Sequence, residues 1–123
     1  MRKNTRAISP AGVSASNFQH LVGVVDPPTF GLTRDELLSV LKAENIAAER
    51  HFHPLSHAVS PFSEIALDPE QLRNTRLAAE WTFQLPIGAR VTLDRVESIC
   101  DVIHEAHLRA DSLRPVLAAS VAI

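Results

Sequence analysis

Residues 50–57 read Arg-His-Phe-His-Pro-Leu-Ser-His and hold a dense set of side chains that could do chemistry. Three of them, His51, His53 and His57, are histidines, which bind metals or exchange protons near neutral pH. Side chains alternate between the two faces of a strand, so His51 and His53 would share one face. Pro54 would end the strand and open a loop. The pattern predicts a strand end and loop that present polar groups at a binding surface.

The spacing of these histidines leaves two interpretations open. A metal site would take His51 and His53 from the strand and His57 from the loop, but zinc needs four convergent ligands, or three and a water. The nearest carboxylates in the sequence are Glu49 and Glu64. The alternative is a strand end whose polar face lines a cleft shared with another domain. The scarcity of further ligands favours this alternative.

Other reactive side chains have no partner at a useful spacing. Cys100 falls on the apolar face of a predicted helix, which is typical of an inert core thiol. His104 and His107 lie three residues apart near the end of that helix, where partly protonated imidazoles favour the negative end of the helix dipole. Ser56 and His57 are adjacent, but no orienting carboxylate is identified for a catalytic triad. We therefore assign no catalytic residue and no metal ligand.

Periodicity and capping signals place these residues in a small α/β domain. Strands are expected at residues 17–26, 46–53 and 82–86, and helices at 33–45, from 68 to about 81, and at 92–107. The first helix begins with a capping box, in which Thr33 and Glu36 satisfy each other's backbone N–H groups. The buried face of the last helix should hold Leu93, Val96, Ile99, Cys100 and Ile103. The order gives an α/β (α+β) fold of two layers, with about three short strands and helices packed on one face, and leaves the strand directions open.

Composition sets the class of protein. The chain has 123 residues, 46% of them hydrophobic, and a net charge of −2 from 12 basic and 14 acidic residues. This is typical of one globular domain, and it offers no positive field for nucleic acid or an anionic membrane. A single cysteine and the absence of a secretory signal fit a cytoplasmic protein. Residues 1–16 are expected to form an irregular arm, residues 17–107 the domain, and residues 108–123 a tail.

Six segments carry a further signal when they are taken together and in order. They are SNFQHLV at 16–22, FGLTRDELL at 30–38, AENI at 43–46, RHFHPLS at 50–56, NTRLAAEWTFQLPIG at 74–88 and VESICDVI at 96–103. In this order and spacing they resemble the C-terminal small domain of the DegT/DnrJ/StrS family of sugar aminotransferases. The resemblance implies the small domain of a fold-type I enzyme that uses pyridoxal phosphate. Such enzymes are dimers that transfer an amino group, usually from glutamate, to a nucleotide-linked keto-sugar in polysaccharide or antibiotic pathways.

The same resemblance implies which side chains contact the substrate. In the family the small domain closes one side of the active-site cleft, and many members have a histidine directly after Pro-Leu. That place is shared here between Ser56 and His57. By resemblance, substrate contacts are therefore expected from Arg50, His53, Ser56 and His57.

The cofactor lysine of the family lies in a large domain upstream of all six segments. The two lysines here are poor substitutes, because Lys3 falls in the arm and Lys42 on the polar side of the first helix. A cofactor lysine needs a desolvated or charge-tuned pocket and an electron-sink partner for the ring. The resemblance thus implies no cofactor and no activity for this chain alone. It indicates a truncated gene product or a domain of a larger enzyme.

Two other functions stay open. One is a stand-alone binding module that pairs with a full-length aminotransferase. The other is a metal-binding module built on His51, His53 and His57. The face that packs on a large domain in the family would be exposed here, so we expect marginal stability or self-association.

Overall fold

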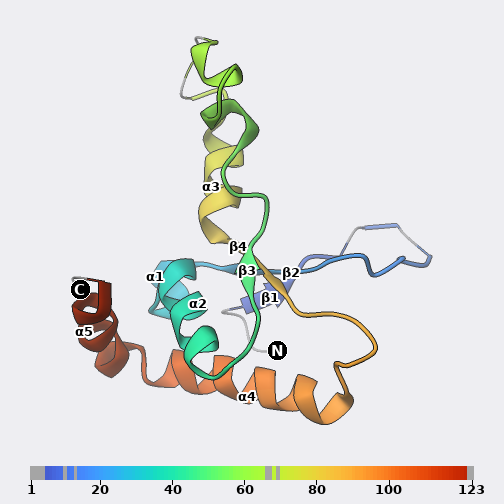
Figure 1. Cartoon of the computed structure of the whole chain (residues 1–123), viewed down its shortest axis with the longest axis vertical. Helices are drawn as coiled ribbons and strands as arrows, with labels where there is room; N and C mark the ends of the chain where they lie inside the picture. Colours follow the sequence, from blue (N-terminus) through green and yellow to red (C-terminus); the bar gives the residue numbers. More distant parts are fainter. Residues whose placement is uncertain (1–4, 10, 13, 66–67, 69, 122–123) are drawn as a thin grey trace.

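A four-stranded antiparallel sheet with the strand order β1-β2-β4-β3 lies at the centre of the protein (Figure 1). The structure is a computed structural model that describes residues 5–9, 11–12, 14–65, 68 and 70–121. In chain order the elements are β1 (Thr5–Ala7), β2 (Leu21–Val25), α1 (Pro27–Phe30), α2 (Arg34–Ala43), β3 (Glu49–Arg50), the 3-10 turns η1 (Ser56–Ala58) and η2 (Phe62–Glu64), α3 (Arg73–Trp81), β4 (Thr82–Leu85), α4 (Leu93–Leu108) and α5 (Ala110–Val121).

One row of paired residues crosses the whole sheet. Ala7 pairs with Gly23, Gly23 with Phe83, and Phe83 with Arg50. Phe83 is fully buried, and its ring lies so close to Gly23 that a Cβ atom there would be 2.5 Å from the ring carbon Cζ. Glycine at this position therefore makes room for the ring, which is a common reason for glycine inside a strand.

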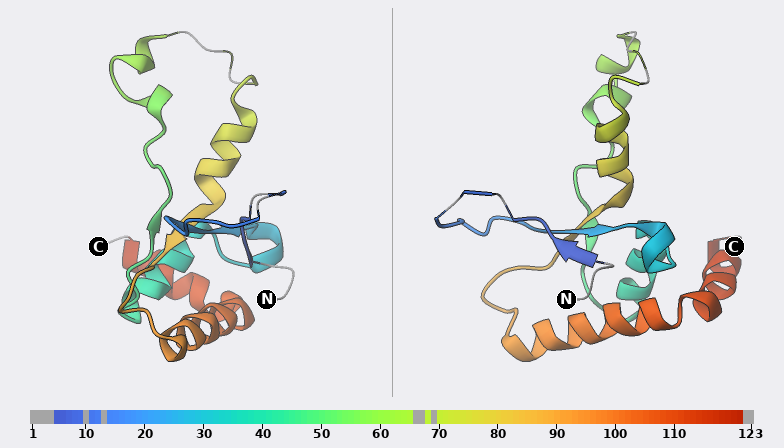
Figure 2. Two further views of the ribbon diagram at one scale, coloured as in Figure 1. Left: turned by 90° about the vertical axis from the view of Figure 1, so that its right-hand side faces the viewer. Right: turned by 180° about the vertical axis from the view of Figure 1, so that it is seen from behind.

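Helices close the core. Helix α2 contacts β4, α4 and α5, and α4 and α5 contact each other (Figures 1 and 2). The capping box predicted at Thr33 and Glu36 is present, and Asn45 has the left-handed conformation that follows the end of α2. The buried cluster consists of Val25, Phe30, Leu32, Leu37, Leu41, Phe83, Ala106 and Ala110. The predicted α/β fold is confirmed.

Helix α3 and residues 51–65 extend away from the sheet as a projecting arm in all three views (Figures 1 and 2). We call residues 51–65 the histidine loop, because they hold three histidines. β3 stops at Arg50, Phe52 has a left-handed backbone with φ of 49°, and Pro54 has no N–H to donate. Large apolar side chains of this loop, including Val59, Phe62 and Ile65, remain exposed.

The number and lengths of the strands differ from prediction. The sheet has a fourth strand because Thr5–Ala7, expected in an irregular arm, pairs with β2. The strand predicted at 17–26 is β2, which begins only at Leu21, and the strand predicted at 46–53 is the two-residue β3. His51 and His53 therefore do not share a strand face, and that prediction was wrong. The division of the chain at residues 17 and 107 stays a prediction.

The ends of two helices also differ from prediction. Helix α3 begins at Arg73, five residues later than predicted. The Asp68 side chain accepts from the Glu70 N–H, but this bond lies before the helix. Pro69 lies outside the described residues. Residues 110–121, which had no predicted structure, form α5. No helix among the described residues has the length and hydropathy that crossing a bilayer requires.

Helix α4 begins as predicted but buries a narrower face. Cys100 is exposed, and so are Leu93 and Val96, so their placement in the core was wrong. The first turns of α4 extend past α2 and the sheet (Figure 1). Ala106, in the second half of the helix, belongs to the core, with Val102 and Ile103 packed beside it. Cys100 lies about 100° around the helix from Ile99, at the edge of the predicted apolar face, and no other element of the described chain covers it there.

Candidate functional site

Arg50 lies at the end of β3, where its guanidinium group binds the carboxylate of Asp35. Nε of Arg50 donates to Oδ1 at 3.1 Å, and Nη2 donates to Oδ2 at 3.0 Å. The same carboxylate accepts from Nε of Arg34 at 2.6 Å. Arg34 is only 5% exposed, and its Nη1 donates to the carbonyl groups of Ala79 and Thr82 at the end of α3. Through Arg34 and Arg50, this aspartate links α2 to the end of α3 and to β3, directly before the histidine loop.

The electrostatics of this contact keep Asp35 ionised. Partial burial works to raise the pKa of Asp35, but hydrogen bonds from Arg34 and Arg50, together with their positive charges, outweigh it. The net pKa of Asp35 lies below its ordinary value. Its place in the first turn of α2 adds the favourable field of the helix N-terminus.

His51 belongs to an aromatic cluster on the sheet rather than to a row of strand histidines. Its ring centroid lies 5.5 Å from that of His20 and 4.1 Å from that of Phe52. His20 also lies 6.0 Å from Phe52, edge to face. Nδ1 of His51 is 3.4 Å from Oε1 of Gln84 in β4. The cluster brings together the segment before β2, strand β4 and the start of the histidine loop.

The other predicted contacts follow along the loop. His53 is exposed and precedes Pro54, Ser56 opens η1 and is exposed, and His57 is half-buried in the same turn. In the part of the chain that the structure describes, no three His, Cys, Asp or Glu side chains gather closely enough to hold a metal ion. The interpretation of His51, His53 and His57 as a metal site therefore receives no support from the geometry.

Four residues of this region were missed from the sequence: His20, Arg34, Asp35 and Gln84. Alternation along the strand predicted at 17–26 would have placed His20 on the same face as Val22. It could not show that β2 pairs with β4, because that requires the order of the strands in the sheet. Asp35 lies in the first turn of α2. Its contact with Arg50 joins residues 15 positions apart, and no local pattern reveals such a contact.

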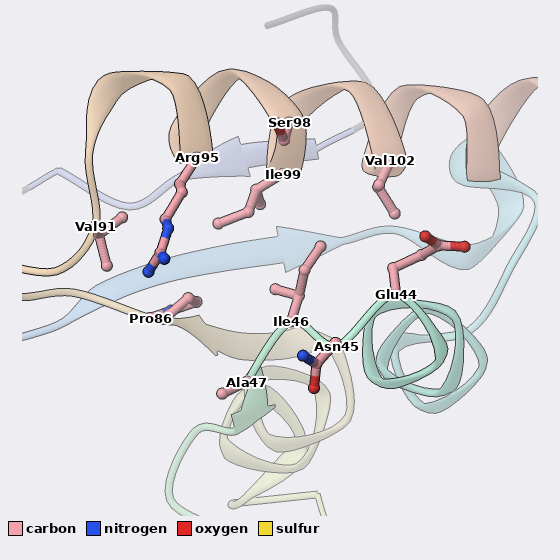
Figure 3. A pocket seen from close by; sticks show the side chains of 10 residues that line it. All are labelled: Glu44, Asn45, Ile46, Ala47, Pro86, Val91, Arg95, Ser98, Ile99 and Val102. Atoms are coloured by element: carbon pink, nitrogen blue, oxygen red, sulfur yellow. The ribbon is translucent and has the colours of Figure 1, made fainter.

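A groove of about 520 Å³ lies elsewhere, between α4 and the segment that joins α2 to β3 (Figure 3). Apolar side chains face one another across it, among them Ile46 and Ile99, while Glu44 and Arg95 add charge. None of the predicted site residues lines this groove. This groove and the histidine loop are thus separate features.

Comparison with known proteins adds a sequence relationship to this geometry. The chain is 32% identical over 98 residues to the dTDP-4-amino-4,6-dideoxy-D-glucose transaminase of Shigella dysenteriae. The match covers 80% of this chain but 26% of the relative, so the chain spans about a quarter of that protein.

Solved structures show the same fold. DesI, crystallised with its TDP-sugar product, superposes with a TM-score of 0.78 over 96% of this chain and 29% of its own, at 24% identity. The aminotransferase TlmJ from Streptoalloteichus hindustanus superposes with a TM-score of 0.67 over 89% of this chain and 27% of its own, at 22% identity.

A family model settles the relationship. The model of the DegT/DnrJ/EryC1/StrS aminotransferase family matches residues 3–104, which is most of the chain and includes both Arg50 and the sheet. This range begins before β1, so the first strand belongs to the shared fold. The chain therefore belongs to the DegT/DnrJ/EryC1/StrS aminotransferase family.

Proposed function

We propose that this chain is the C-terminal domain of a sugar-nucleotide aminotransferase. The reaction would move an amino group from an amino acid such as glutamate to a keto-sugar linked to a nucleotide. The observation that carries the proposal is the 32% identity to a dTDP-sugar transaminase along 80% of this chain. Since the chain spans a quarter of that relative, the reaction requires further residues that hold the cofactor.

Pyridoxal phosphate would supply the electron sink of this reaction. It is held by a lysine in a desolvated or charge-tuned pocket. Lys42, the one lysine that the structure describes, is exposed in the last turn of α2. The described residues do not fit the cofactor, and we infer that another domain binds it.

The contribution of this chain would be to bind and orient the substrate. Arg50 presents a planar cation, which matches phosphate and carboxylate groups. His53 and Ser56 are exposed in the same loop, and His57 lies beside them. Together these side chains offer charge-assisted and neutral hydrogen bonds to the phosphates and hydroxyls of a nucleotide sugar.

The first test is to read the DNA upstream of Met1 in the same frame. A large domain with a cofactor lysine is expected there. The purified protein that includes this domain should then transfer an amino group from glutamate to a dTDP-linked keto-sugar. In that protein Arg50→Gln should raise KM about tenfold, as expected for the loss of one charge-assisted hydrogen bond. A purified protein that transfers no amino group to any nucleotide sugar would overturn the proposal.

A second candidate function is an interaction module that pairs with a full-length aminotransferase or with a second copy of itself. Exposed apolar side chains favour it, because Phe18, Phe52 and Leu93 are 76%, 72% and 80% exposed. Sedimentation of the isolated chain over a range of concentrations tests this candidate. A mass that stays monomeric at high concentration, with no association after addition of a full-length relative, would rule it out.

A further inference from the structure

The contact between Asp35 and Arg50 has two unequal sides. On one side, Arg34 is buried and is held by the carbonyl groups of Ala79 and Thr82. On the other side, the Arg50 side chain is 45% exposed, and its only hydrogen bonds that the structure records in the described chain go to Asp35. Asp35 thus binds the buried Arg34 on one side and holds the more exposed Arg50 on the other.

The geometry suits orientation better than stability. Exposed ion pairs contribute little to the free energy of folding, because water screens them and ordering two side chains is unfavourable. A guanidinium group that binds both oxygens of a carboxylate is nevertheless fixed in plane and direction. Asp35 engages Nε and one N–H of Nη2 of Arg50, which leaves the N–H groups of Nη1 and the second N–H of Nη2 as donors directed away from the pair.

We propose that Asp35 is a positioning residue, which is anchored by Arg34 and holds Arg50 in one orientation at the start of the histidine loop. The oriented Nη1 group would bind an anionic group of a substrate, either a phosphate of the nucleotide sugar or the carboxylate of the amino donor. The substrate contact rests on the proposed function, whereas the positioning of Arg50 does not.

The positioning is tested on the ligand-free chain by ¹H–¹⁵N NMR of the arginine Nε–H groups. In the unmodified chain, the Arg50 signal should show slow exchange with water and restricted motion, unlike that of Arg90, which is exposed. Asp35→Asn should release Arg50, while Arg34 stays ordered because its two backbone acceptors remain.

Asp94 offers a matched control. It occupies the same second position of the first turn in α4, and its carboxylate has no arginine partner among the ion pairs of the described residues. Asp94→Asn removes the same charge at the same helix position and should leave Arg50 ordered. The proposal is overturned if Arg50 is as mobile as Arg90 in the unmodified chain, or if Asp94→Asn releases it equally.

The substrate contact is tested in the enzyme that includes this chain. Asp35→Asn should raise KM by up to about tenfold for one substrate only, with little change in kcat, as expected for a disordered binding group. A rise for the nucleotide sugar identifies the phosphate as the ligand, and a rise for glutamate identifies the carboxylate. Combining Asp35→Asn with Arg50→Gln should add little to Arg50→Gln alone.

Two results separate this inference from the proposed function. If Asp35→Asn releases Arg50 but neither it nor Arg50→Gln changes any KM, the positioning stands and the substrate contact is wrong. If Arg50→Gln raises KM and Asp35→Asn does not, Arg50 binds substrate without help from Asp35, and the inference fails while the proposed function stands.

Discussion

Helices α2 and α4 begin with the same pattern, a threonine followed two residues later by an aspartate, yet their first turns lie in different surroundings. At α2, Thr33 accepts from the Glu36 N–H at 3.2 Å, and Glu36 accepts from the Thr33 N–H at 2.7 Å. At α4, the Thr92 side chain makes no capping hydrogen bond. A capping box needs an acceptor three residues after the cap, and that residue in α4 is Arg95, which cannot accept.

The two helix starts differ in packing as well as in capping. In α2, Leu37 is fully buried one turn into the helix, and Arg34 binds the end of α3. In α4, Leu93 is exposed, and Arg95 donates to the carbonyl of its neighbour Arg90 at 2.9 Å. The two threonines predicted both helix starts from local sequence. Only α2 uses its first turn to hold the fold together, because Leu37 and Arg34 contact other elements there.

The largest expected effect contrasts the leucines of the two helix starts. Leu37→Ala should lower the free energy of unfolding by about 2–5 kcal/mol, because it leaves a cavity in a fully buried site. Leu93→Ala should change it by less than about 0.5 kcal/mol, because that side chain is exposed. Urea unfolding of both variants measures the difference. Equal losses would mean that α4 buries Leu93 against a partner in solution.

The arginines should give the second largest contrast. Arg34→Met keeps the apolar stem but leaves the carbonyl groups of Ala79 and Thr82 without their donor, at a cost of about 1–3 kcal/mol. Arg95→Met should cost less than about 0.5 kcal/mol, because Arg95 is exposed. Protection of the α3 amides from hydrogen exchange should fall in Arg34→Met and not in Arg95→Met. An unchanged α3 in both variants would contradict the role of Arg34.

Substitutions of Thr33 and Thr92 should differ in their effect on the free energy of unfolding by the contribution of one helix cap. Thr33→Ala removes a capping box and should cost about 1 kcal/mol, whereas Thr92→Ala removes no capping hydrogen bond. Melting temperatures of the two variants, measured side by side, show the difference. If Thr92→Ala proves as costly as Thr33→Ala, then α4 is capped in solution.

The smallest contrast is between Asp35 and Asp94 in the pH dependence of the free energy of unfolding. The pKa of Asp35 is lowered in the folded protein, so its contribution to stability is fully present above its ordinary value of 3.8 and is lost as pH falls through the lowered pKa. The contribution should be about 0.2–1 kcal/mol, the range of exposed ion pairs. Asp35→Asn should flatten this part of the acid side of the stability curve, and added salt should shrink the effect. Asp94→Asn, measured alongside, should leave this Asp35 contribution in place.

Local signals predicted much of the helical structure and little of the site. The capping box of α2 and the start of α4 follow from residues within one turn of each other. Strand β1 was missed because three polar and small residues carry no periodic signal, and it exists only through pairing with β2. Cys100 was misplaced because periodicity predicts an apolar face but not how far another element covers it.

The candidate site shows the same limit more sharply. Arg50 was singled out from its motif, but its orientation depends on Asp35 and Arg34, which lie on another element. His51 was expected beside His53 on one strand face and lies instead beside His20, because β3 ends at Arg50, one residue before His51. Contacts between distant segments decide both cases, and a single sequence does not reveal them.

The row Ala7–Gly23–Phe83–Arg50 has a consequence for protein engineering. A transplant of the histidine loop onto another scaffold has to bring this row with it, because Arg50, the residue before the loop, pairs with Phe83. The Phe83 ring in turn has room only because Gly23 has no side chain. A host strand with alanine or valine opposite the ring would force the ring to move, because a Cβ atom at that place would be 2.5 Å from Cζ. Gly23, which lies on another strand, therefore has to be carried along with the histidine loop.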